Sequence, residues 1–455
     1  MEMVLEFLRD VLSQPALLIG IMSCVGLVAL KRPFHKVMTG TLKPILGYLM
    51  LAAGAGVIVS NLDPLGKMIE HGFHITGVVP NNEAIVAVAQ KVLGVETMSI
   101  LVVGLLMNLC IARFTKFKYV FLTGHHSLFM ACLMSAVLGT AGLSGMDLIL
   151  VGGFLMGAWS AISPAIGQSY TSKVTDGDEI AIGHFGSLGY YLSAWVAQYV
   201  GKAEDSTEDI EIPEKWGFLR DSTLSTALTM IVFYLIAAIA AGSEFVSTLS
   251  GDMSPYLYAV MSAMNFAVGV TIVYSGVRMI LGDLIPAFQG IATKIIPNAI
   301  PAVDCAVFFT YAPTAVVLGF LSSFIGGIIG MLILGAVGGV LIIPGLVPHF
   351  FCGATAGIYG NATGGRRGAA VGAFLNGLAI TFLPAMALPV LGQLGFQNTT
   401  FGDADFAVMG LVLGNAYEWV GMAGIYGIVA IAALVLIIPN FIKTKGKVIN
   451  YVEED

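Results

Sequence analysis

Long apolar runs, separated by short polar connections, dominate this chain. A helix needs about 20 mainly apolar residues to cross the hydrocarbon core of a bilayer. Eleven runs of roughly this length or more lie near residues 13–30, 38–60, 96–112, 119–141, 147–166, 223–243, 255–277, 306–338, 341–362, 368–393 and 408–442. Several are too long or too interrupted to be regular helices. The pattern predicts an all-α polytopic membrane protein with about 11 transmembrane helices and re-entrant segments.

Basic residues are distributed unevenly between the connections. If the N-terminus faces the periplasm, all but Arg9, Lys67 and Lys91 of the 21 lysines and arginines lie on the cytoplasmic side. Cytoplasmic loops of membrane proteins carry such an excess, and the opposite orientation would destroy it. We therefore expect a periplasmic N-terminus and a cytoplasmic C-terminus. The acidic start, Met1 to Val4, predicts a retained first span rather than a cleaved signal peptide.

Composition restricts the class of protein further. Hydrophobic residues make up 57% of the 455 residues and charged residues 11%, against about 25% charged residues in soluble proteins. This excludes a soluble globule, and we expect no nucleic-acid partner. Because the sequence has no Walker lysine loop, HExxH or GxSxG motif, nothing indicates ATP hydrolysis or hydrolytic catalysis. We expect no cofactor and no metal, and packing roles for the five cysteines.

One carboxylate stands in an otherwise apolar run. Asp304 follows Pro301, Ala302 and Val303 within residues 299–324, and an acid at membrane depth is costly enough to suggest a functional site. The same order of proline, two residues and an acid occurs at Pro80 to Glu83. This indicates a duplication offset by about 220 residues. Because the expected topology places an odd number of spans between the two copies, the repeats would be inverted, as in many transporters.

The duplication predicts a division of the chain into four parts. Residues 1–166 would form the first inverted repeat and residues 223–393 the second. Residues 167–222 would form a re-entrant and cytoplasmic connector, in which the acidic stretch 201–221 is expected to be solvated. Residues 394–455 would supply the final span and a cytoplasmic tail.

Three histidines lie inside or beside predicted spans. His125 and His126 lie near the start of a predicted span, and His349 has a comparable place in the second half. A fourth, His184, belongs to a segment that is too polar to face lipid. A buried neutral imidazole donates one hydrogen bond and accepts another, which suits a polyhydroxylated ligand; a structural role remains open for each. No pair of histidines has the sequence spacing of a metal site.

Several stretches together resemble one family of transporters. They are Thr123-Gly124-His125, the run from Val174 to His184, the stretch from Ala287 through Asp304 to Ala306, the run from Ala312 to Phe320, and Ile342-Ile343-Pro344-Gly345. These stretches look like the ascorbate-specific permease, the enzyme IIC component of the bacterial phosphoenolpyruvate-dependent sugar phosphotransferase system (PTS). The similarity extends over nearly the whole chain.

The resemblance implies a homodimer in the bacterial inner membrane, with a mobile core domain and a V-shaped dimerisation domain. It implies inward transport of L-ascorbate by an elevator-like motion, coupled to phosphorylation by a separate phosphocysteine protein, enzyme IIB, and an upstream enzyme IIA. Glu83 and Asp304 would be candidate proton acceptors. The implied substrate-binding residues are Asn82, Glu83, His125, His126, Ser127, Leu128, Phe129, His184, Phe185 and Asp304.

The sequence differs from the family pattern at two positions, and the charge of the implied substrate raises a question about the two carboxylates. Phe129 and Phe185 stand where members of that family have glutamine, so these positions would offer a ring face or backbone groups. Ascorbate is an anion, and two ionised carboxylates would repel it. Glu83 and Asp304 would therefore bind hydroxyls far from the acidic ring, or be protonated. An ion-coupled secondary transporter of a small sugar or carboxylate is the alternative function, and a membrane enzyme without transport is a weaker one.

Overall fold

The protein is almost entirely helical. The computed structural model describes residues 11, 14–74, 77–78, 80, 82–177, 179–210, 222–392 and 400–441. Seven of the described helices are long and apolar enough to cross a membrane, and the bent pair α8 and α9 would make an eighth. The predicted polytopic helical membrane class is confirmed at this level. The predicted cytoplasmic tail lies largely outside the described residues.

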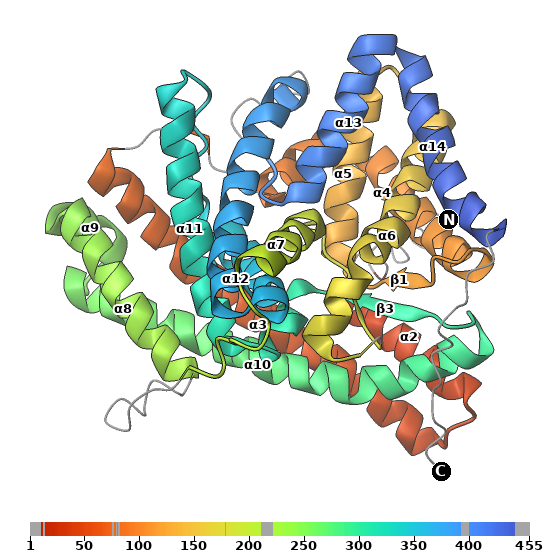
Figure 1. Ribbon diagram of the computed structural model, residues 1–455, viewed down its shortest axis with the longest axis horizontal. Helices are drawn as coiled ribbons and strands as arrows, with labels where there is room; N and C mark the ends of the chain where they lie inside the picture. The colour runs from red at the N-terminus through yellow and green to blue at the C-terminus, as the bar shows by residue number, and fades with distance from the viewer. Residues whose placement is uncertain are drawn as a thin grey trace.

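Helices make up most of the described chain, with three short strands between them (Figure 1). Their bounds are α2 Pro15–Ala29, α3 Phe34–Phe73, α4 Asn82–Phe114, β1 Tyr119–Phe121, α5 Gly124–Thr140, α6 Gly145–Thr175, β2 Ala181–Ile182, α7 Ser187–Val200, α8 Ser222–Ala241, α9 Ser243–Ser250, α10 Pro255–Lys294, β3 Ile300–Val303, the 3-10 helix η2 Cys305–Thr310, α11 Pro313–Ala336, α12 Leu346–Gly392, α13 Ala404–Val420 and α14 Met422–Phe441.

The described helices differ from the eleven predicted apolar runs in three places. The predicted run 408–442 is two helices, α13 and α14, because Gly421 between them has a positive φ of 64°. The helices α5 and α13 have 17 residues each, or about 26 Å at 1.5 Å per residue, which is short for a full crossing. The runs 341–362 and 368–393 are joined in α12, where Gly364 and Gly365 leave helical geometry between them.

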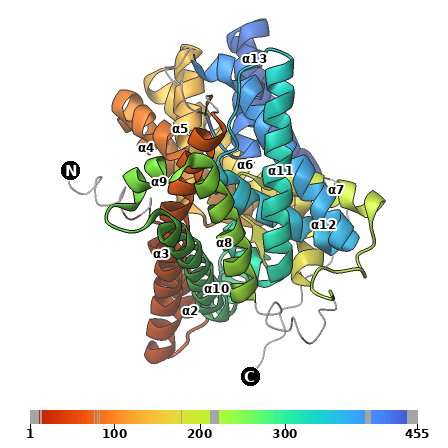
Figure 2. The same cartoon turned by 90° about the vertical axis from the view of Figure 1, so that its left-hand side faces the viewer.

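The helices form two groups that meet along one face. We name α2, α3, α8, α9 and α10 the base layer, because these helices pack mainly on one another. The helices α4 to α7 and α11 to α14 pack mainly among themselves and form the main bundle. Figure 2 shows α3 and α10 on one side and α11, α12 and α7 on the other. Relatively few contacts join the two groups.

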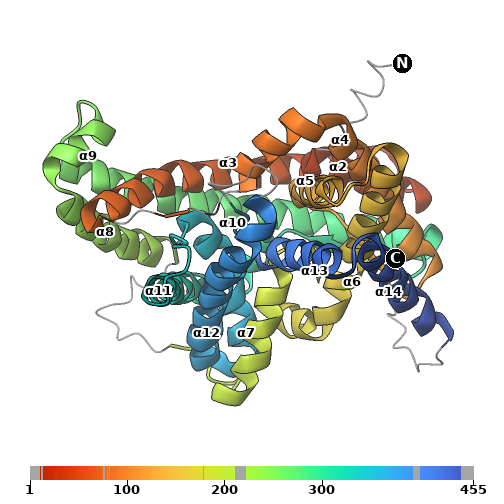
Figure 3. The same cartoon turned by 90° about the horizontal axis from the view of Figure 1, so that it is seen from above.

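The base layer is built on two long helices that cross closely. The helices α3 and α10 have 40 residues each, and seen from above they run side by side along much of the molecule (Figure 3). A Cβ at Gly47 would lie 2.8 Å from the carbonyl oxygen of Gly276, and one at Gly54 would lie 2.7 Å from that of Gly269. The partner numbers fall as the α3 numbers rise, so the helices are antiparallel. Glycine at these positions lets the two backbones touch.

A small parallel sheet, which the helical prediction did not include, lies inside the main bundle. β3 lies between β1 and β2, with Ile300 opposite Tyr119 and Ala302 opposite Ala181. Val78 and Pro80 likewise form parallel bridges to Ile342 and Thr400. Non-helical backbone away from water needs such internal hydrogen bonds. The segments that precede Asn82 and Asp304 are therefore each held between two extended segments of the other half of the chain.

Most residues of the connector segment 201–210 are exposed, and hydrogen bonds attach this segment to the main bundle. α6 continues to Thr175, past the expected repeat boundary at residue 166. Thr207 is fully buried, and its N–H donates to Asn361 Oδ1. The N–H of Arg366 donates to the carbonyl of Asp205 over 2.8 Å. Residues 201–210 are thus bound to the main bundle at the break in α12, whereas residues 211–221 lie outside the described part.

Candidate functional site

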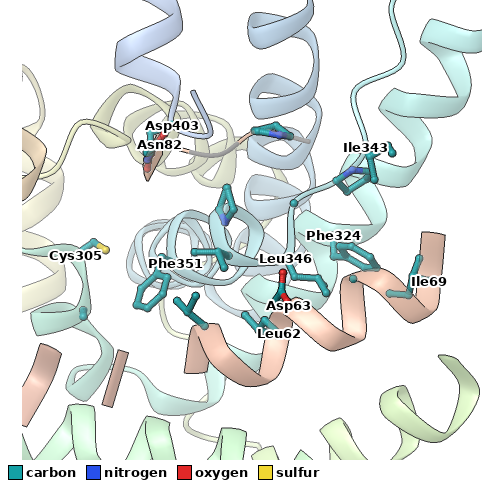
Figure 4. Close-up of a pocket in the computed structure, with 18 of the residues that line it drawn as sticks. Leu62, Asp63, Ile69, Asn82, Cys305, Phe324, Ile343, Leu346, Phe351 and Asp403 are labelled. Atoms are coloured by element: carbon teal, nitrogen blue, oxygen red, sulfur yellow. The ribbon is translucent and has the colours of Figure 1, made fainter. Parts of the chain in front are cut away.

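One large cavity lies between the base layer and the main bundle. Its volume is about 1140 Å³, and its apolar lining comes mainly from α3, α8, α11 and the start of α12. Figure 4 shows Asn82, Asp403 and Cys305 at one side of this cavity, and Asp63 and Leu62 of α3 at the other. The polar side chains of the bundle gather at one part of the wall. They are Asn82, His125, His126, His184, Asp304 and Asp403.

Asp304 lies where extended chain turns into a helix. β3 ends at Val303 and η2 begins at Cys305, and Asp304 Oδ1 accepts a hydrogen bond of 3.0 Å from the N–H of Ala306. This fixes the carboxylate as the cap of η2. The second oxygen, Oδ2, lies 3.4 Å from Nε2 of His125. The lone acid predicted from the sequence therefore reaches the cavity with one oxygen engaged by backbone and the other beside an imidazole.

His125 connects the two helix groups. It lies in the first turn of α5, and its Nδ1 is 3.2 Å from the hydroxyl of Tyr48 in α3. Because Nε2 lies beside Asp304, the ring stands between a hydroxyl of the base layer and a carboxylate of the main bundle.

The rings of His126 and His184 lie in close contact deeper in the wall, tilted by 45° to each other. Their ring centroids are 3.8 Å apart. The N–H of Phe185 donates to Nδ1 of His126 over 3.3 Å, and the N–H of Gly186 donates to Nδ1 of His184 over 3.2 Å. A backbone N–H can only donate, so each Nδ1 carries a lone pair and each neutral ring carries its proton on Nε2. Both rings then offer one N–H donor.

Asp403 is a site residue that the sequence reading missed. Its Oδ2 accepts from Asn82 Nδ2 over 2.6 Å, and its Oδ1 accepts from the Cys352 thiol over 2.8 Å. Asn82 Oδ1 in turn accepts from the N–H of Gly402. The signal was present as two acids, Asp403 and Asp405, just before the last apolar run. Asn82 was expected to contact substrate. In the structure, both the Nδ2 and the Oδ1 of its amide make hydrogen bonds that hold the start of α4 to the loop before α13.

Asp405 has a structural position instead. It is fully buried and accepts from the N–H of Leu188, the hydroxyl of Ser187 and the indole N–H of Trp159. Its carboxylate thus caps the first turn of α7 from the start of α13. It joins α6, α7 and α13 behind the cavity wall.

The remaining predicted residues fall into two sets. Phe129 lines the cavity, with its ring centroid 5.8 Å from that of His125. Ser127, Leu128 and Phe185 do not line it: Ser127 donates to the carbonyl of Thr123, and Phe185 is fully buried against Phe121. The side chain of Glu83 lies outside the described part of the structure. His349 is bonded to Ser323 and also lies off the cavity.

Three side chains come close enough to resemble a metal site. Potential ligand atoms of His126, His184 and Asp403 lie within 4.8 Å of one another. Sequence spacing did not indicate this, because the three residues belong to three separate segments. The lone pairs on Nδ1 of both imidazoles already accept backbone N–H groups, so the described rings offer donors rather than lone pairs. The arrangement suits an anionic or hydroxyl-bearing ligand better than a cation.

The sequence comparisons assign the family. The family model of the PTS system sugar-specific permease component, EIIC-GAT, matches residues 10–405. The chain belongs to this permease family. It is also 26% identical over 474 aligned positions to a protein of Mycoplasma pneumoniae described as an ascorbate-specific PTS system EIIC component, with 90% of this chain and 70% of the relative covered. The family resemblance predicted from the sequence is confirmed.

Family membership fixes the general role of the permease. It is the membrane component of a sugar PTS, which cooperates with EIIA and EIIB components. The apolar helices fit a multi-pass position in the inner membrane. The cavity, with its polar groups gathered on the wall of the main bundle, is the candidate substrate site.

Proposed function

We propose that this permease binds L-ascorbate at the polar part of the cavity and carries it inward for phosphorylation by enzyme IIB. The observation that carries this proposal is the pairing of donors with an acceptor. His126 and His184 each offer an Nε2–H group, and Asp304 offers carboxylate oxygen on the same cavity wall. The Mycoplasma relative, described as ascorbate-specific, supports the choice among sugars.

The chemistry of ascorbate matches this pairing. Its ring oxygens carry the negative charge, and imidazole N–H groups stabilise such oxygens. Its hydroxyl-bearing side chain needs acceptors, which Asp304 and, by the sequence repeat, Glu83 provide. In the phosphoryl transfer, a carboxylate takes the hydroxyl proton while the hydroxyl oxygen forms the new bond to phosphorus. The bond from phosphorus to the enzyme IIB cysteine sulfur breaks, and the thiolate leaves.

Two inverted repeats would give the transporter two related conformations, in which the site opens to opposite sides of the membrane. Both ends of α10 lie 221 residues after the ends of α3, and Asp304 lies 221 residues after Glu83. α13 begins and ends about 220 residues after α7. The antiparallel α3 and α10 agree with inverted orientation. On this offset the repeats extend past the predicted limits of 166 and 393, to include α7 and α13.

The two helix groups suggest which parts move. We infer that the base layer is the static, dimerising part and the main bundle the mobile core of an elevator-like transporter. The sparse contacts between the groups support this division. Exposed apolar side chains on α8 and α10, among them Val232, Ile239 and Val268, would supply the homodimer contact. Membership in a PTS family favours phosphorylation over an ion gradient as the source of energy.

Binding of ascorbate to Asp304→Asn protein tests the proposal. The amide keeps the size of the carboxylate but replaces an acceptor with a donor, so a substrate hydroxyl loses its partner. We expect affinity to fall roughly ten- to a hundredfold, as for a lost charge-assisted bond of about 1.5–3 kcal/mol. Titration calorimetry of the purified protein measures this. His71→Ala, a change at an exposed ring stacked on Phe245 in the base layer, is the control.

The outcome that contradicts the proposal is also specific. If folded Asp304→Asn protein binds ascorbate as tightly as the parent, Asp304 does not contact the substrate. If the parent binds another sugar but not ascorbate, the substrate assignment is wrong while the family role stands.

A further inference from the structure

Tyr48 belongs to the base layer and makes a hydrogen bond to one of the polar residues that the main bundle contributes to the cavity. It lies in α3, whereas His125, His126, His184, Asp304 and Asp403 belong to the main bundle. Its side chain is 7% exposed, and its hydroxyl lies 3.2 Å from Nδ1 of His125. A buried hydroxyl without a partner is costly, so this hydrogen bond accounts for a tyrosine rather than a phenylalanine here.

The position of Tyr48 in α3 is fixed from behind. The preceding residue, Gly47, touches the backbone of α10 at Gly276. A side chain at Gly47 would enter this contact, so α3 has little freedom to shift locally. The hydroxyl of Tyr48 therefore has a fixed place in the base layer, and it faces the main bundle.

The position of the proton on His125 follows from its two polar neighbours. Nε2 lies 3.4 Å from Asp304 Oδ2, and a carboxylate oxygen attracts an N–H group rather than a nitrogen lone pair. The proton of the neutral ring is then on Nε2, so Nδ1 accepts and the Tyr48 hydroxyl donates. Tyr48 is thus hydrogen-bonded to His125, and the opposite nitrogen of His125 faces the Asp304 carboxylate that we assign to substrate.

We propose that Tyr48 is a positioning residue through which the base layer sets the proton of His125 and the orientation of Asp304 in the present conformation. This inference rests on the proposed function, because a movement of the main bundle along α3 would separate Tyr48 from His125. His125 would then lose its only described donor to Nδ1 and be free to turn. Substrate affinity would then differ between the present position of the main bundle and the position after its movement. In this way the base layer would contribute to substrate binding and release.

The test is the Tyr48→Phe variant in two backgrounds. In otherwise native protein, we expect ascorbate affinity to fall roughly three- to tenfold, as for loss of one hydrogen bond. In His125→Ala protein, the same change should cost nothing, because Tyr48 acts through that ring. Tyr234→Phe is the matched control, since this hydroxyl bonds to the Asn61 carbonyl within the base layer. Its affinity should equal that of the parent.

A spectroscopic measurement separates positioning from a merely structural role. In protein labelled with ¹⁵N-histidine, the two ring nitrogens of a fixed tautomer give distinct signals, and the His125 pair is identified by its loss in His125→Gln protein. Tyr48→Phe should replace the single tautomer of His125 with a mixture. Tyr234→Phe should leave the signals unchanged.

Two results would overturn the inference. An equal loss of affinity from Tyr48→Phe in both backgrounds would mean that Tyr48 contacts the ligand directly. Unchanged affinity together with an unchanged His125 tautomer would mean that the hydroxyl does not control the ring. If the parent protein does not bind ascorbate, the proposed function fails instead, and the ¹⁵N signals still decide whether Tyr48 sets the tautomer.

Discussion

At the scale of single residues, the site is held by reciprocal bonds between distant parts of the chain. Asn82 donates to Asp403 and accepts from the N–H of Gly402, so both ends of its amide are used. The Cys352 thiol donates to the same carboxylate. These bonds explain why an asparagine precedes the predicted acid Glu83: it holds the start of α4 against the loop that carries Asp403.

Replacing this amide with a carboxylate should disrupt the site. Asn82→Asp places a second acid within hydrogen-bond distance of the buried Asp403, where like charges repel. We expect a loss of stability of about 1–3 kcal/mol or more, seen as a thermal unfolding midpoint lower by several degrees, together with weaker ascorbate binding. The double variant Asn82→Asp with Asp403→Asn should restore most of the stability and most of the ascorbate affinity, because one amide donor again faces one carboxylate acceptor. Failure of the double variant to rescue either property would argue against the pair.

At the scale of elements, the connector closes the start of a helix. Glu208 accepts from the N–H groups of Thr314 and Ala315 and from the hydroxyl of Thr314. These are otherwise unpaired donors in the first turn of α11, where a negative charge is favourable. The segment 201–210 is thus fastened to the main bundle at α11 and at the break in α12.

Removal of this cap should loosen the connector without touching the cavity. We expect Glu208→Ala to lower stability by about 0.5–2 kcal/mol, the usual cost of a lost helix cap, and to raise hydrogen exchange at Thr314 and Ala315. Glu204→Ala, a change at a neighbouring exposed acid, is the control. Equal protection of the α11 amides in both variants would show that Glu208 does not cap the helix.

At the scale of the whole molecule, orientation in the membrane remains a prediction from the basic residues. His74 follows the end of α3 and Asp205 lies in the connector, and both are exposed. In protein whose native cysteines are replaced, a cysteine at position 74 should react with a membrane-impermeant thiol reagent added to intact cells. A cysteine at position 205 should react only after the cells are opened. The reverse pattern would invert the predicted topology and place the cytoplasmic face at the other end of α3.

The sequence by itself determined the membrane class and the family, and it predicted Asp304 as a site residue. Apolar runs and an isolated acid within one of them are local signals. They can be recognised without knowing how distant parts of the chain pack. It also predicted His125, His126, Phe129 and His184, which line the cavity together with Asn82. It placed Ser127, Leu128 and Phe185 beside them, because neighbours in sequence cannot be sorted by direction until the helix and its packing are known.

Only the tertiary structure decided which distant groups meet. Asp403 lies 321 residues from Asn82, and Tyr48 lies 77 residues from His125, so no local pattern relates them. The small sheet was equally invisible, since each of its strands has four residues or fewer and pairs with a segment far away. Span counting also failed where a glycine divides α13 from α14. Hydropathy measures how apolar a segment is, whereas backbone geometry and long-range hydrogen bonds decide where a helix stops and what its polar groups face.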